Sequence, residues 1–455
     1  MAADILSRCT YHVVTYGCQM NKHDSERVSG LLEEFGSVSV DTIEEADVVV
    51  FMTCCVREAA DVRLRGQVET MKNYPLREGS PLKQRVIAIG GCIGQRDGQG
   101  LIDDMPHVTT VFGTHNLDAL PHLISSALTE HTSQAQILDS TDSFWSDLPS
   151  VREHAWSAWL PITMGCNNFC TYCIVPYVRG REKSRPIEEI EAEAKTLVAD
   201  GVKEITLLGQ NVNSYGRDLY GQPRFADVLE KVAGTGVRYL RYATSHPKDL
   251  TDEVISKFAT LDCVAPALHL PAQSGSNRIL KAMNRRYTRE HYLELVRKVR
   301  EACPDIALST DIIVGFPGET EEDFQDTYDL VKEVGYSQVF TFIYSKREGT
   351  PAARMEDDTP HEVIQERFER LVNLVQEKAY ERNQLDADAV VEVLVESLNK
   401  RDASSITGRT PKNQTVHATV PEGVKPTDLI GKVCKVQVTL AKTWYLSGHV
   451  VEISA

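Results

Sequence analysis

The stretch Cys166-Asn167-Asn168-Phe169-Cys170-Thr171-Tyr172-Cys173 carries three thiols at the spacing CxxxCxxC. Thiols at this spacing converge on a single small inorganic centre. A structural zinc normally takes four protein ligands, and the nearest further cysteines are Cys92 and Cys263. A 4Fe-4S cluster held by three cysteines leaves one iron open to bind a second molecule. The stretch therefore predicts such a cluster. A zinc site completed by a distant ligand, or three separate buried thiols, are the alternatives.

The length and composition predict a cytoplasmic protein of several domains. At roughly 150 residues per domain, a chain of 455 residues predicts two to four domains. The sequence has no run of about 18 apolar residues, and its N-terminus lacks a basic region followed by an apolar stretch. We therefore expect no membrane span and no export. In a reducing compartment, the 11 cysteines are metal ligands or buried thiols rather than disulfides.

The charge is distributed unevenly along the chain. A net charge of −16 argues against binding nucleic acid through the charge of the protein as a whole. Residues 397–455 differ, because eight Lys and Arg there outnumber four Asp and Glu. We therefore expect any polyanion to be bound by the C-terminal segment and by local basic clusters.

Residues 9–128 alternate between strand and helix patterns. A β-branched and aromatic run at 10–17 is followed by a helix whose apolar face extends from Val28 to Phe35. This alternation predicts an open parallel α/β sheet. The further predicted strands are 46–53, 85–91 and 108–112, and the further helix is 117–128.

Three of these predicted strands end at a cysteine, namely Cys18, Cys54 and Cys92. In open α/β sheets, ligands bind outside the carboxyl ends of the strands, so the three thiols have a common meeting place. A single cysteine at a strand end is usually a small core residue. Three cysteines in register favour a metal cluster over that alternative.

A linker is predicted at 129–151, followed by a second domain at 152–383. Its first strand leads into the CxxxCxxC loop, and strand and helix patterns then alternate regularly. The pattern indicates a partial (βα)6 barrel rather than eight closed units. The predicted strands are 159–164, 205–209, 239–243, 265–270, 306–314 and 338–344, and the predicted helices are 187–200, 224–234, 251–260, 288–302, 320–334 and, closing the domain, 359–385.

Polar turns follow the strands of this barrel, at the end where such barrels keep their chemistry. Gly315 and Gly318 permit a close approach of the backbone to a ligand, although a plain strand-to-helix connection has the same composition. Asp311, on the preceding strand, is expected to point a carboxylate toward the cavity. The turns are Gln210-Asn211, Ser245-His246, Gln273-Ser274 and Gly315-Phe316-Pro317-Gly318-Glu319.

Residues 384–455 change to short β runs separated by turns, which predict a small all-β barrel. Basic residues are spread over it, among them Arg409 and Lys412. A basic all-β appendage on an acidic protein indicates an RNA-binding module, and a solvated surface with ordinary lysines is the alternative. The predicted strands are 390–395, 405–408, 415–418, 433–440 and 446–453.

The CxxxCxxC stretch, with an aromatic residue before its last cysteine, resembles the signature of the radical S-adenosylmethionine (SAM) enzymes. Nearly the whole chain resembles the methylthiotransferase family. The resemblance implies an α/β fold class with three parts: an N-terminal open parallel α/β domain, a central partial (βα)6 radical SAM barrel and a C-terminal small all-β TRAM barrel. The stretches that carry it are Thr15 to Asn21 (TYGCQMN), Gly209 to Gly216 (GQNVNSYG), Leu268 to Ser276 and Ser309 to Thr320.

The resemblance also implies the roles of particular residues. It assigns Cys18, Cys54 and Cys92 to an auxiliary 4Fe-4S cluster, and Cys166, Cys170 and Cys173 to the cluster that binds SAM. The family usually has Asn-Thr-Cys where this chain has Met52-Thr53-Cys54-Cys55, so Cys55 competes with Cys54, although the following Val56-Arg57-Glu58 favours Cys54. The residues expected at SAM are Tyr172, Asn211, Ser245, Gln273, Asp311 and Gly315. Those expected at RNA are Arg179, Arg181, Arg285, Arg409 and Lys412, with salt-bridged helix ends as the alternative for the first three.

The implied reaction replaces the hydrogen at C2 of a prenylated adenosine, beside the anticodon at tRNA position 37, by a methylthio group. One SAM methylates a sulfur on the auxiliary cluster, and a second is cleaved by one electron to the 5′-deoxyadenosyl radical. Ordinary acid–base groups cannot do this chemistry, so cofactors must carry it. The implied cofactors are two 4Fe-4S clusters and SAM. The implied partners of the expected monomer are a tRNA anticodon stem-loop, whose single-stranded bases are readily splayed into pockets, and an electron donor such as flavodoxin or ferredoxin.

Three alternatives differ from this function. Family members that modify a threonylcarbamoyladenosine in tRNA, or an aspartate of a ribosomal protein, share both clusters. They are expected to carry Cys-Lys-Val-Asn or Cys-Pro-Lys-Asn where this chain has Cys18-Gln19-Met20-Asn21. A non-catalytic iron–sulfur protein that binds RNA and senses redox state would not need a complete barrel with turns facing SAM.

Overall fold

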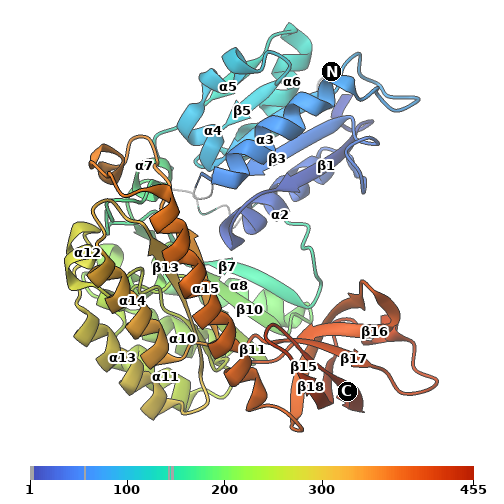
Figure 1. The fold of residues 1–455 in the computed structure, drawn as a ribbon. Helices are drawn as coiled ribbons and strands as arrows, with labels where there is room; N and C mark the ends of the chain where they lie inside the picture. The colour runs from blue at the N-terminus through green and yellow to red at the C-terminus, as the bar shows by residue number, and fades with distance from the viewer. Residues whose placement is uncertain (1–4, 56–57, 142–143, 145–147, 455) are drawn as a thin grey trace. The chain divides into compact units, whose positions relative to one another are not determined.

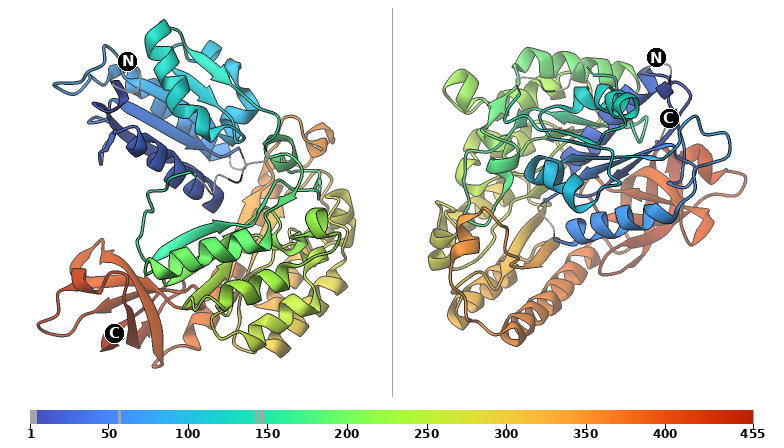
Figure 2. Two further views of the ribbon diagram at one scale, coloured as in Figure 1. Left: turned by 180° about the vertical axis from the view of Figure 1, so that it is seen from behind. Right: turned by 90° about the horizontal axis from the view of Figure 1, so that it is seen from above.

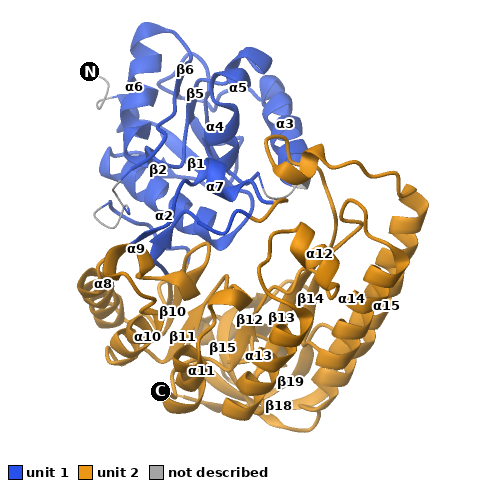
Figure 3. Ribbon diagram, turned by 90° about the vertical axis from the view of Figure 1, so that its left-hand side faces the viewer, with its two compact units in different colours: residues 1–153, 159–169, 173–185 blue, residues 154–158, 170–172, 186–455 orange. Residues whose placement is uncertain are grey.

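The computed structural model describes residues 5–55, 58–141, 144 and 148–454, so Val56 and Arg57 lie outside the described residues. The chain forms two compact units (Figure 3). The first comprises residues 1–153, 159–169 and 173–185, and the second comprises residues 154–158, 170–172 and 186–455. Of the CxxxCxxC cysteines, Cys166 and Cys173 therefore belong to the first unit and Cys170 to the second.

The first unit contains a six-stranded sheet in which every neighbouring pair of strands is parallel (Figure 1). The predicted open parallel α/β sheet is confirmed. Sequence patterns missed the edge strands β2 and β6, which are too short to show a period, and β6 lies in the stretch predicted to be a linker. The strand order is β2 (Val38–Ser39), β1 (Thr10–Thr15), β3 (Val48–Thr53), β4 (Val86–Gly91), β5 (Thr110–Phe112) and β6 (Gln134–Gln136).

Helices cover both faces of this sheet (Figure 2). On one face, α2 (Gln19–Glu34) and α6 (Leu120–Glu130) pack on Val48, Val50 and Met52 of β3. On the other face, α3 (Glu58–Thr70), α4 (Cys92–Asp97) and α5 (Gln99–Asp104) pack on Val49 and Phe51. A strand buried on both faces needs a continuous apolar run, which explains why β3 was recognisable in the sequence.

The strand order reverses between β1 and β3. The chain passes from β1 to the edge strand β2 and then returns to add β3 on the other side of β1. In doubly covered sheets, the crevice at such a reversal is the usual place for a ligand. Cys18 follows β1 and Cys54 follows β3, so both border this crevice, and Cys92 follows the neighbouring β4.

The second unit begins with two groups of parallel strands. In the first, β10 (Glu204–Leu208) pairs with β11 (Tyr239–Tyr242). The second is a three-stranded sheet with the order β12 (Ala267–His269), β13 (Ala307–Val314) and β14 (Gln338–Ile343). The preceding strand β7 (Ser157–Pro161) is divided between the two units, with Ser157 and Ala158 in the second. A parallel bridge between Leu240 and Val264 joins the two groups of strands. These parallel strands agree with the predicted partial barrel. The predicted strand 265–270 narrows to β12 because Pro266 and Pro271 flank it and cannot donate to the sheet.

The helices of this part lie where the sequence predicts them. Three of these helices begin at a threonine cap. Thr251, Thr288 and Thr320 each accept a hydrogen bond from the backbone N–H three residues later. The helices are α8 (Ile187–Ala199), α10 (Phe225–Ala233), α11 (Asp252–Thr260), α13 (Arg289–Ala302), α14 (Glu321–Val334) and α15 (His361–Gln384). Two short helices were not expected, α9 (Arg217–Tyr220) and α12 (Asn277–Ala282).

The C-terminal part of the second unit is a closed five-stranded barrel, which confirms the predicted small all-β barrel. Its apolar core includes Val395, Ile406 and Val436. The strand order is β15 (Val390–Asn399), β16 (Asp402–Arg409), β17 (Thr415–Thr419), β19 (Leu446–Ile453) and β18 (Val433–Ala441). Within the described residues, no helix combines the length and the apolar character that a membrane crossing requires.

Candidate functional site

Three of the predicted ligand cysteines end neighbouring strands of the first unit. Cys18 is the N-cap of α2, Cys54 follows β3, and Cys92 is the first residue of α4. Cys54 and Cys92 are buried, whereas Cys18 is half-buried. Cys18 and Cys54 interact by a hydrogen bond, and Cys92 is close enough to Cys18 for their charges to interact. The structure therefore brings these three thiols together at the crevice.

Gly17 allows the ends of β1 and β3 to approach each other. Its φ of +115° is one that side chains rarely adopt. A Cβ at Gly17 would lie 2.2 Å from the Cβ and 3.0 Å from the Sγ of Cys54. Only glycine fits here, which explains its place directly before Cys18.

A buried arginine lies among these thiols. Arg179 follows α7 (Val175–Val178) and donates from Nη2 to Asn21 Oδ1 (2.9 Å) and to Asp24 Oδ2 (3.1 Å). Asn21 Oδ1 in turn lies 4.0 Å from Cys18 Sγ, and the charge of Arg179 lowers the pKa of Cys18 and of Cys92. Only 8 % of Arg179 is exposed, and its guanidinium is held by contacts inside the first unit. Its expected contact with an RNA phosphate remains a prediction.

This environment favours the thiolate form of two cysteines. A hydrogen bond from Cys54 and the charge of Arg179 lower the pKa of Cys18, and a hydrogen bond from Cys55 and the charge of Arg179 lower the pKa of Cys92. The hydrogen bond to Cys92 and burial raise the pKa of Cys55. Because metals bind thiolates, Cys18 and Cys92 are prepared as ligands, while Cys55 packs in the apolar core as a neutral thiol.

The donor set fits an iron–sulfur cluster better than a single metal ion. A 4Fe-4S cluster is a larger body that offers a separate iron to each thiolate. Soft thiolates also favour iron–sulfur clusters over hard cations such as Mg²⁺.

In the first unit, the start of the CxxxCxxC loop packs on residues 180–182. Cys166 N donates to Gly180 O (3.1 Å), and a Cβ on Gly165 would lie 2.1 Å from Arg181 O. The Arg181 guanidinium lies 4.5 Å from the centre of the Phe169 ring. Arg181 itself is exposed, so its predicted contact with RNA remains a prediction.

In the second unit, Cys170 lies beside a second buried arginine. Arg285 Nη1 is 3.6 Å from Cys170 Sγ, and Nη2 donates to Pro271 O (2.7 Å). Only 4 % of Arg285 is exposed, and its expected contact with RNA remains a prediction. Tyr172 packs against the apolar cluster that contains Met283 and Phe316. Its predicted contact with SAM is untested.

Buried polar atoms without a partner follow β10 and β11. Asn211 Nδ2 donates to Asp249 Oδ2 (2.7 Å), but Asn211 Oδ1 has no partner in the described part of the chain. The same holds for Asn213 Nδ2 and Ser245 Oγ. Because an unpaired buried polar atom is costly, such atoms indicate a missing ligand or water. Asn211 and Ser245 are among the residues expected at SAM, and those contacts remain predictions; Asn213 was not predicted.

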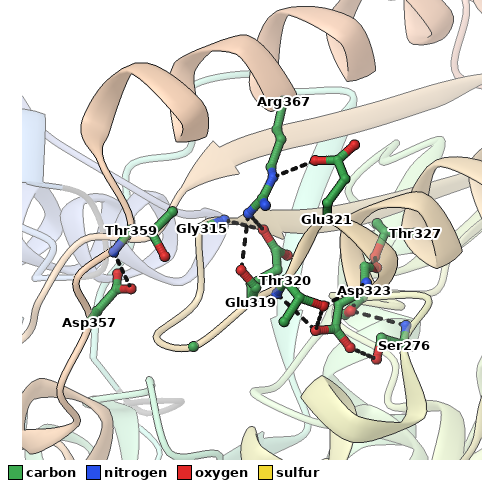
Figure 4. Close-up of polar contacts among 12 residues, drawn as sticks. Ser276, Gly315, Glu319, Thr320, Glu321, Asp323, Thr327, Asp357, Thr359 and Arg367 are labelled. Atoms are coloured by element: carbon green, nitrogen blue, oxygen red, sulfur yellow. Dashed lines mark hydrogen bonds and ion pairs between the residues drawn. The ribbon is translucent and has the colours of Figure 1, made fainter.

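The turn from Gly315 to Glu319 is shaped by a buried carboxylate (Figure 4). Gly315 N donates to Glu319 Oε2 (2.8 Å), and Arg367 of α15 donates to Glu319 O (3.0 Å). A Cβ on Gly315, whose φ is +71°, would lie 2.6 Å from Ile364 of α15. Burial raises the pKa of Glu319 to about 7, although the charge of Arg367 opposes this. Glu319 was not predicted as a functional residue. Its position at the end of a glycine turn was the only available signal.

The other predicted SAM contacts lie on and beside β13. Gln273 N donates to Asp311 O (2.8 Å), and Gln273 has a φ of +70°. The carboxylate of Asp311 lies 3.3 Å from His269 Nε2 and is partly exposed. Both residues therefore lie on or beside β13 of the predicted sheet. Their contact with SAM remains a prediction.

The predicted RNA contacts of the C-terminal barrel are engaged in ion pairs. Arg409 pairs with Glu396, and Lys412 Nζ lies 3.3 Å from Asp386 and 3.4 Å from Asp305. Arg409 and Lys412 nevertheless remain partly exposed. Their contact with RNA stays a prediction.

Three family models match successive parts of the chain. Residues 10–113 match the model described as "Uncharacterized protein family UPF0004", residues 160–331 match the radical SAM superfamily, and residues 389–451 match the TRAM domain. Each match falls within one of the three domains that the sequence predicts.

Relatives with similar sequences extend over almost the whole chain. A tRNA-2-methylthio-N(6)-dimethylallyladenosine synthase of Thermoanaerobacter sp. (strain X514) is 48% identical over 446 residues, which are 97% of this chain and 93% of that protein. The protein of the same name from Carboxydothermus hydrogenoformans is 46% identical over 97% of this chain and 99% of its own. The one from Acidothermus cellulolyticus is 49% identical over 92% of this chain and 84% of its own.

Solved structures resemble the fold at low sequence identity. The radical S-adenosylmethionine methyltransferase TsrM from Kitasatospora setae has a TM-score of 0.53 and 13% identity, covering 76% of this chain and 74% of its own. The cobalamin-dependent radical enzyme OxsB has a TM-score of 0.51 and 12% identity, covering 82% of this chain and 56% of its own. At such identities, the likeness concerns the fold alone.

Proposed function

Because the chain belongs to the family of tRNA-2-methylthio-N(6)-dimethylallyladenosine synthases, we propose that it methylthiolates C2 of N6-dimethylallyladenosine at position 37 of tRNA. The observation that carries this proposal is the 48% identity to a synthase of that name over 97% of the chain. Cys18-Gln19-Met20-Asn21 supports it over the two related substrates, which are expected with other residues at Gln19 and Met20.

We assign the auxiliary cluster to Cys18, Cys54 and Cys92. Their common position at the reversal of the strand order supports this assignment, as do the lowered pKa values of Cys18 and Cys92. The neutral character of Cys55 and its packing in the apolar core favour Cys54 as the third ligand. Cys166, Cys170 and Cys173 would hold the other cluster, and their spacing is the support.

Bound clusters and SAM would supply one-electron cleavage of SAM and the sulfur that is transferred. The chain's own residues position these groups. Asn211 Oδ1 would accept a hydrogen bond from SAM, and Ser245 Oγ would donate or accept one, because both atoms are buried without a partner in the described residues. Glu319 fixes the Gly315 turn through the Gly315 N–H, which keeps the backbone open for close approach.

The proposed partners are tRNA and a one-electron donor. The match of residues 389–451 to the TRAM domain, together with the basic composition of that part, supports binding of the anticodon stem-loop. A small electron-transfer protein such as flavodoxin or ferredoxin would supply the electrons that SAM cleavage consumes.

The test is anaerobic reconstitution with iron and sulfide, followed by reaction with SAM, reductant and prenylated tRNA. We expect about eight irons per chain and a 2-methylthio product in the digested nucleosides by mass spectrometry. Cys18→Ala should retain SAM cleavage but lose the product and about four irons, whereas Cys166→Ala should lose both SAM cleavage and the product. Full product from Cys18→Ala would refute the auxiliary assignment. SAM cleavage without a product on prenylated tRNA would refute the substrate.

A further inference from the structure

Arg179 is a buried cation placed against two thiols that the proposed function assigns to the auxiliary cluster. Asn21 Oδ1, which Arg179 Nη2 contacts, lies 4.0 Å from Cys18 Sγ, and the charge of Arg179 lowers the pKa of Cys18 and of Cys92. Arg179 Nη2 is held by Asn21 Oδ1 at 2.9 Å and by Asp24 Oδ2 at 3.1 Å. All five residues belong to the first unit, and Arg179 and Asp24 are at most 8 % exposed.

Burying a charged guanidinium costs folding free energy, so such an arrangement indicates that the charge has a function in the folded protein. One carboxylate, Asp24, is enough to neutralise one guanidinium, yet Arg179 also faces two thiols. Hydrogen bonds to the sulfur atoms and net charge are two of the levers that set the reduction potential of an iron–sulfur cluster. A fixed positive charge favours the reduced state, because reduction adds a negative charge nearby.

We propose that Arg179 is a positioning residue for the auxiliary cluster: its guanidinium compensates the negative charge of the ligand thiolates and raises the reduction potential of the cluster. Asn21 and Asp24 hold the guanidinium in place. This inference rests on the proposed function, because it needs a cluster on Cys18, Cys54 and Cys92.

The position of Arg179 in the chain gives the inference a second consequence. Arg179 lies six residues after Cys173, at the end of α7, while its partners Asn21 and Asp24 lie on α2. The segment that leaves the CxxxCxxC loop therefore contributes to the other group of cysteines. Thr114 Oγ1 donates to Val178 O (2.8 Å) and fixes the same segment on the loop after β5.

The test measures the reduction potential of the auxiliary cluster alone. The full-length chain with Cys166→Ala, Cys170→Ala and Cys173→Ala is reconstituted anaerobically, and its iron content is measured first. A redox titration followed by electron paramagnetic resonance then gives the ratio of reduced to oxidised cluster at each potential. Arg179→Gln, Arg179→Lys, Asp24→Asn and Arg85→Gln are compared in this background.

We expect Arg179→Gln to lower the reduced-to-oxidised ratio at least tenfold at a fixed potential, which is a shift of 59 mV for a one-electron couple. Arg179→Lys keeps the charge and should stay within about threefold of the parent. Asp24→Asn removes a negative charge and should shift the ratio the opposite way, toward the reduced form. A purely structural role predicts no such reversal of sign.

Arg85→Gln is the matched control. Arg85 is also 8 % exposed in the same unit, but it donates to the carbonyl oxygens of Ala46, Glu44 and Pro75 and to no thiol. We expect lower stability and an unchanged potential. Equal shifts in Arg85→Gln and Arg179→Gln, or shifts of the same sign in Arg179→Gln and Asp24→Asn, would overturn the role of Arg179. If the parent background binds no iron, the auxiliary cluster itself fails, and this inference fails with it.

Discussion

Gly17 shows how one residue controls whether two ligand cysteines meet. Its missing side chain leaves room for Cys54, and its φ of +115° turns the chain toward Cys18. Any larger residue must push apart the ends of β1 and β3, which are the two strands on either side of the crevice. The effect of a substitution should therefore be local to the auxiliary site.

We predict that Gly17→Ala loses about four of about eight irons and the methylthio product, but retains SAM cleavage. A Cβ 2.2 Å from Cys54 Cβ cannot be accommodated without moving Cys54. Iron analysis and SAM cleavage assays check this. Gly66→Ala is the control, because Gly66 lies on the exposed side of α3 with nothing within 4 Å of an added Cβ. It should keep all irons and gain about 0.5–1 kcal/mol of stability. Full iron content in Gly17→Ala would contradict the prediction.

Glu319 makes stability depend on pH. Its pKa is about 7 in the folded protein and 4.5 as an unperturbed group. Between these values the folded state holds one proton more than the unfolded state, so stability falls as pH rises from 4.5 to 7, by about 3 kcal/mol, and then stays level. We predict that Glu319→Gln removes this fall.

Denaturant unfolding at pH 5 and pH 8 measures the effect of Glu319. As pH rises from 4.5 to 7, the free energy of unfolding of Glu319→Gln should increase relative to that of the parent. Glu322→Gln, on the exposed side of the following helix, should follow the parent at both values. A parent and a Glu319→Gln variant with parallel pH profiles would show that Glu319 titrates normally.

Arg241 is one of the side chains that join strands β10 and β11 to the C-terminal barrel. Arg241 of β11 pairs with Glu204 of β10 at 2.6 Å and donates to Pro411 O (2.9 Å) and Thr410 O (3.0 Å) in the turn after β16. Trp156, Tyr239, Leu394 and Val433 form an apolar cluster that joins the same parts. The contacts of the barrel with this part therefore include the hydrogen bonds of Arg241, which its ion pair with Glu204 positions, and a small apolar cluster.

We predict that Arg241→Met destabilises the protein by roughly 3–5 kcal/mol, because the Glu204 carboxylate loses its close partner inside the fold. Glu204 is only 5% exposed, and its remaining cation, Arg409, is 3.9 Å away. Chemical denaturation measures the loss. Arg297→Met removes an exposed ion pair on α13 and should change stability by less than about 1 kcal/mol. Equal losses in the two variants would contradict the docking role.

The sequence predicted elements where one local signal was strong. The continuous apolar run of β3 and the threonine caps of α11, α13 and α14 are local, and these elements were found. The edge strands β2 and β6 were missed because two or three residues show no period. The partners of Arg179 were not predicted for a different reason: they lie more than 150 residues away in sequence, so only the folded chain reveals its burial.

Because the protein carries a net negative charge, only a few of its residues are candidates for contacts with tRNA. The net charge is −16, and Arg409 and Lys412 are engaged in ion pairs. Lys400, Arg401 and Lys442 of the C-terminal barrel are exposed and form no salt bridge within the described residues. They are the better candidates for contacts with phosphates.

We predict that changing Lys400, Arg401 or Lys442 to Ala weakens tRNA binding with little effect on stability. Each lost phosphate contact should reduce the slope of log K against log salt by about 0.7–0.9. Binding titrations at several salt concentrations check this. Lys195→Ala, in an ion pair with Glu191 on α8, should leave the slope unchanged. An unchanged slope in all three barrel variants would exclude these residues from the tRNA surface.

Helix α15 links the two ends of the second unit. Near its start, Ile364 packs on Gly315 and Arg367 holds the Glu319 carbonyl, while at its end Asn383 and Gln384 donate to the β18–β19 turn at Lys442, Thr443 and Ala441. Its 24 residues span about 36 Å. One inserted residue would rotate everything after it by about 100° and disengage one end or the other. Helix α15 thus fixes both the distance and the rotation between the groups at its two ends. Insertions and deletions among related proteins should therefore lie outside it.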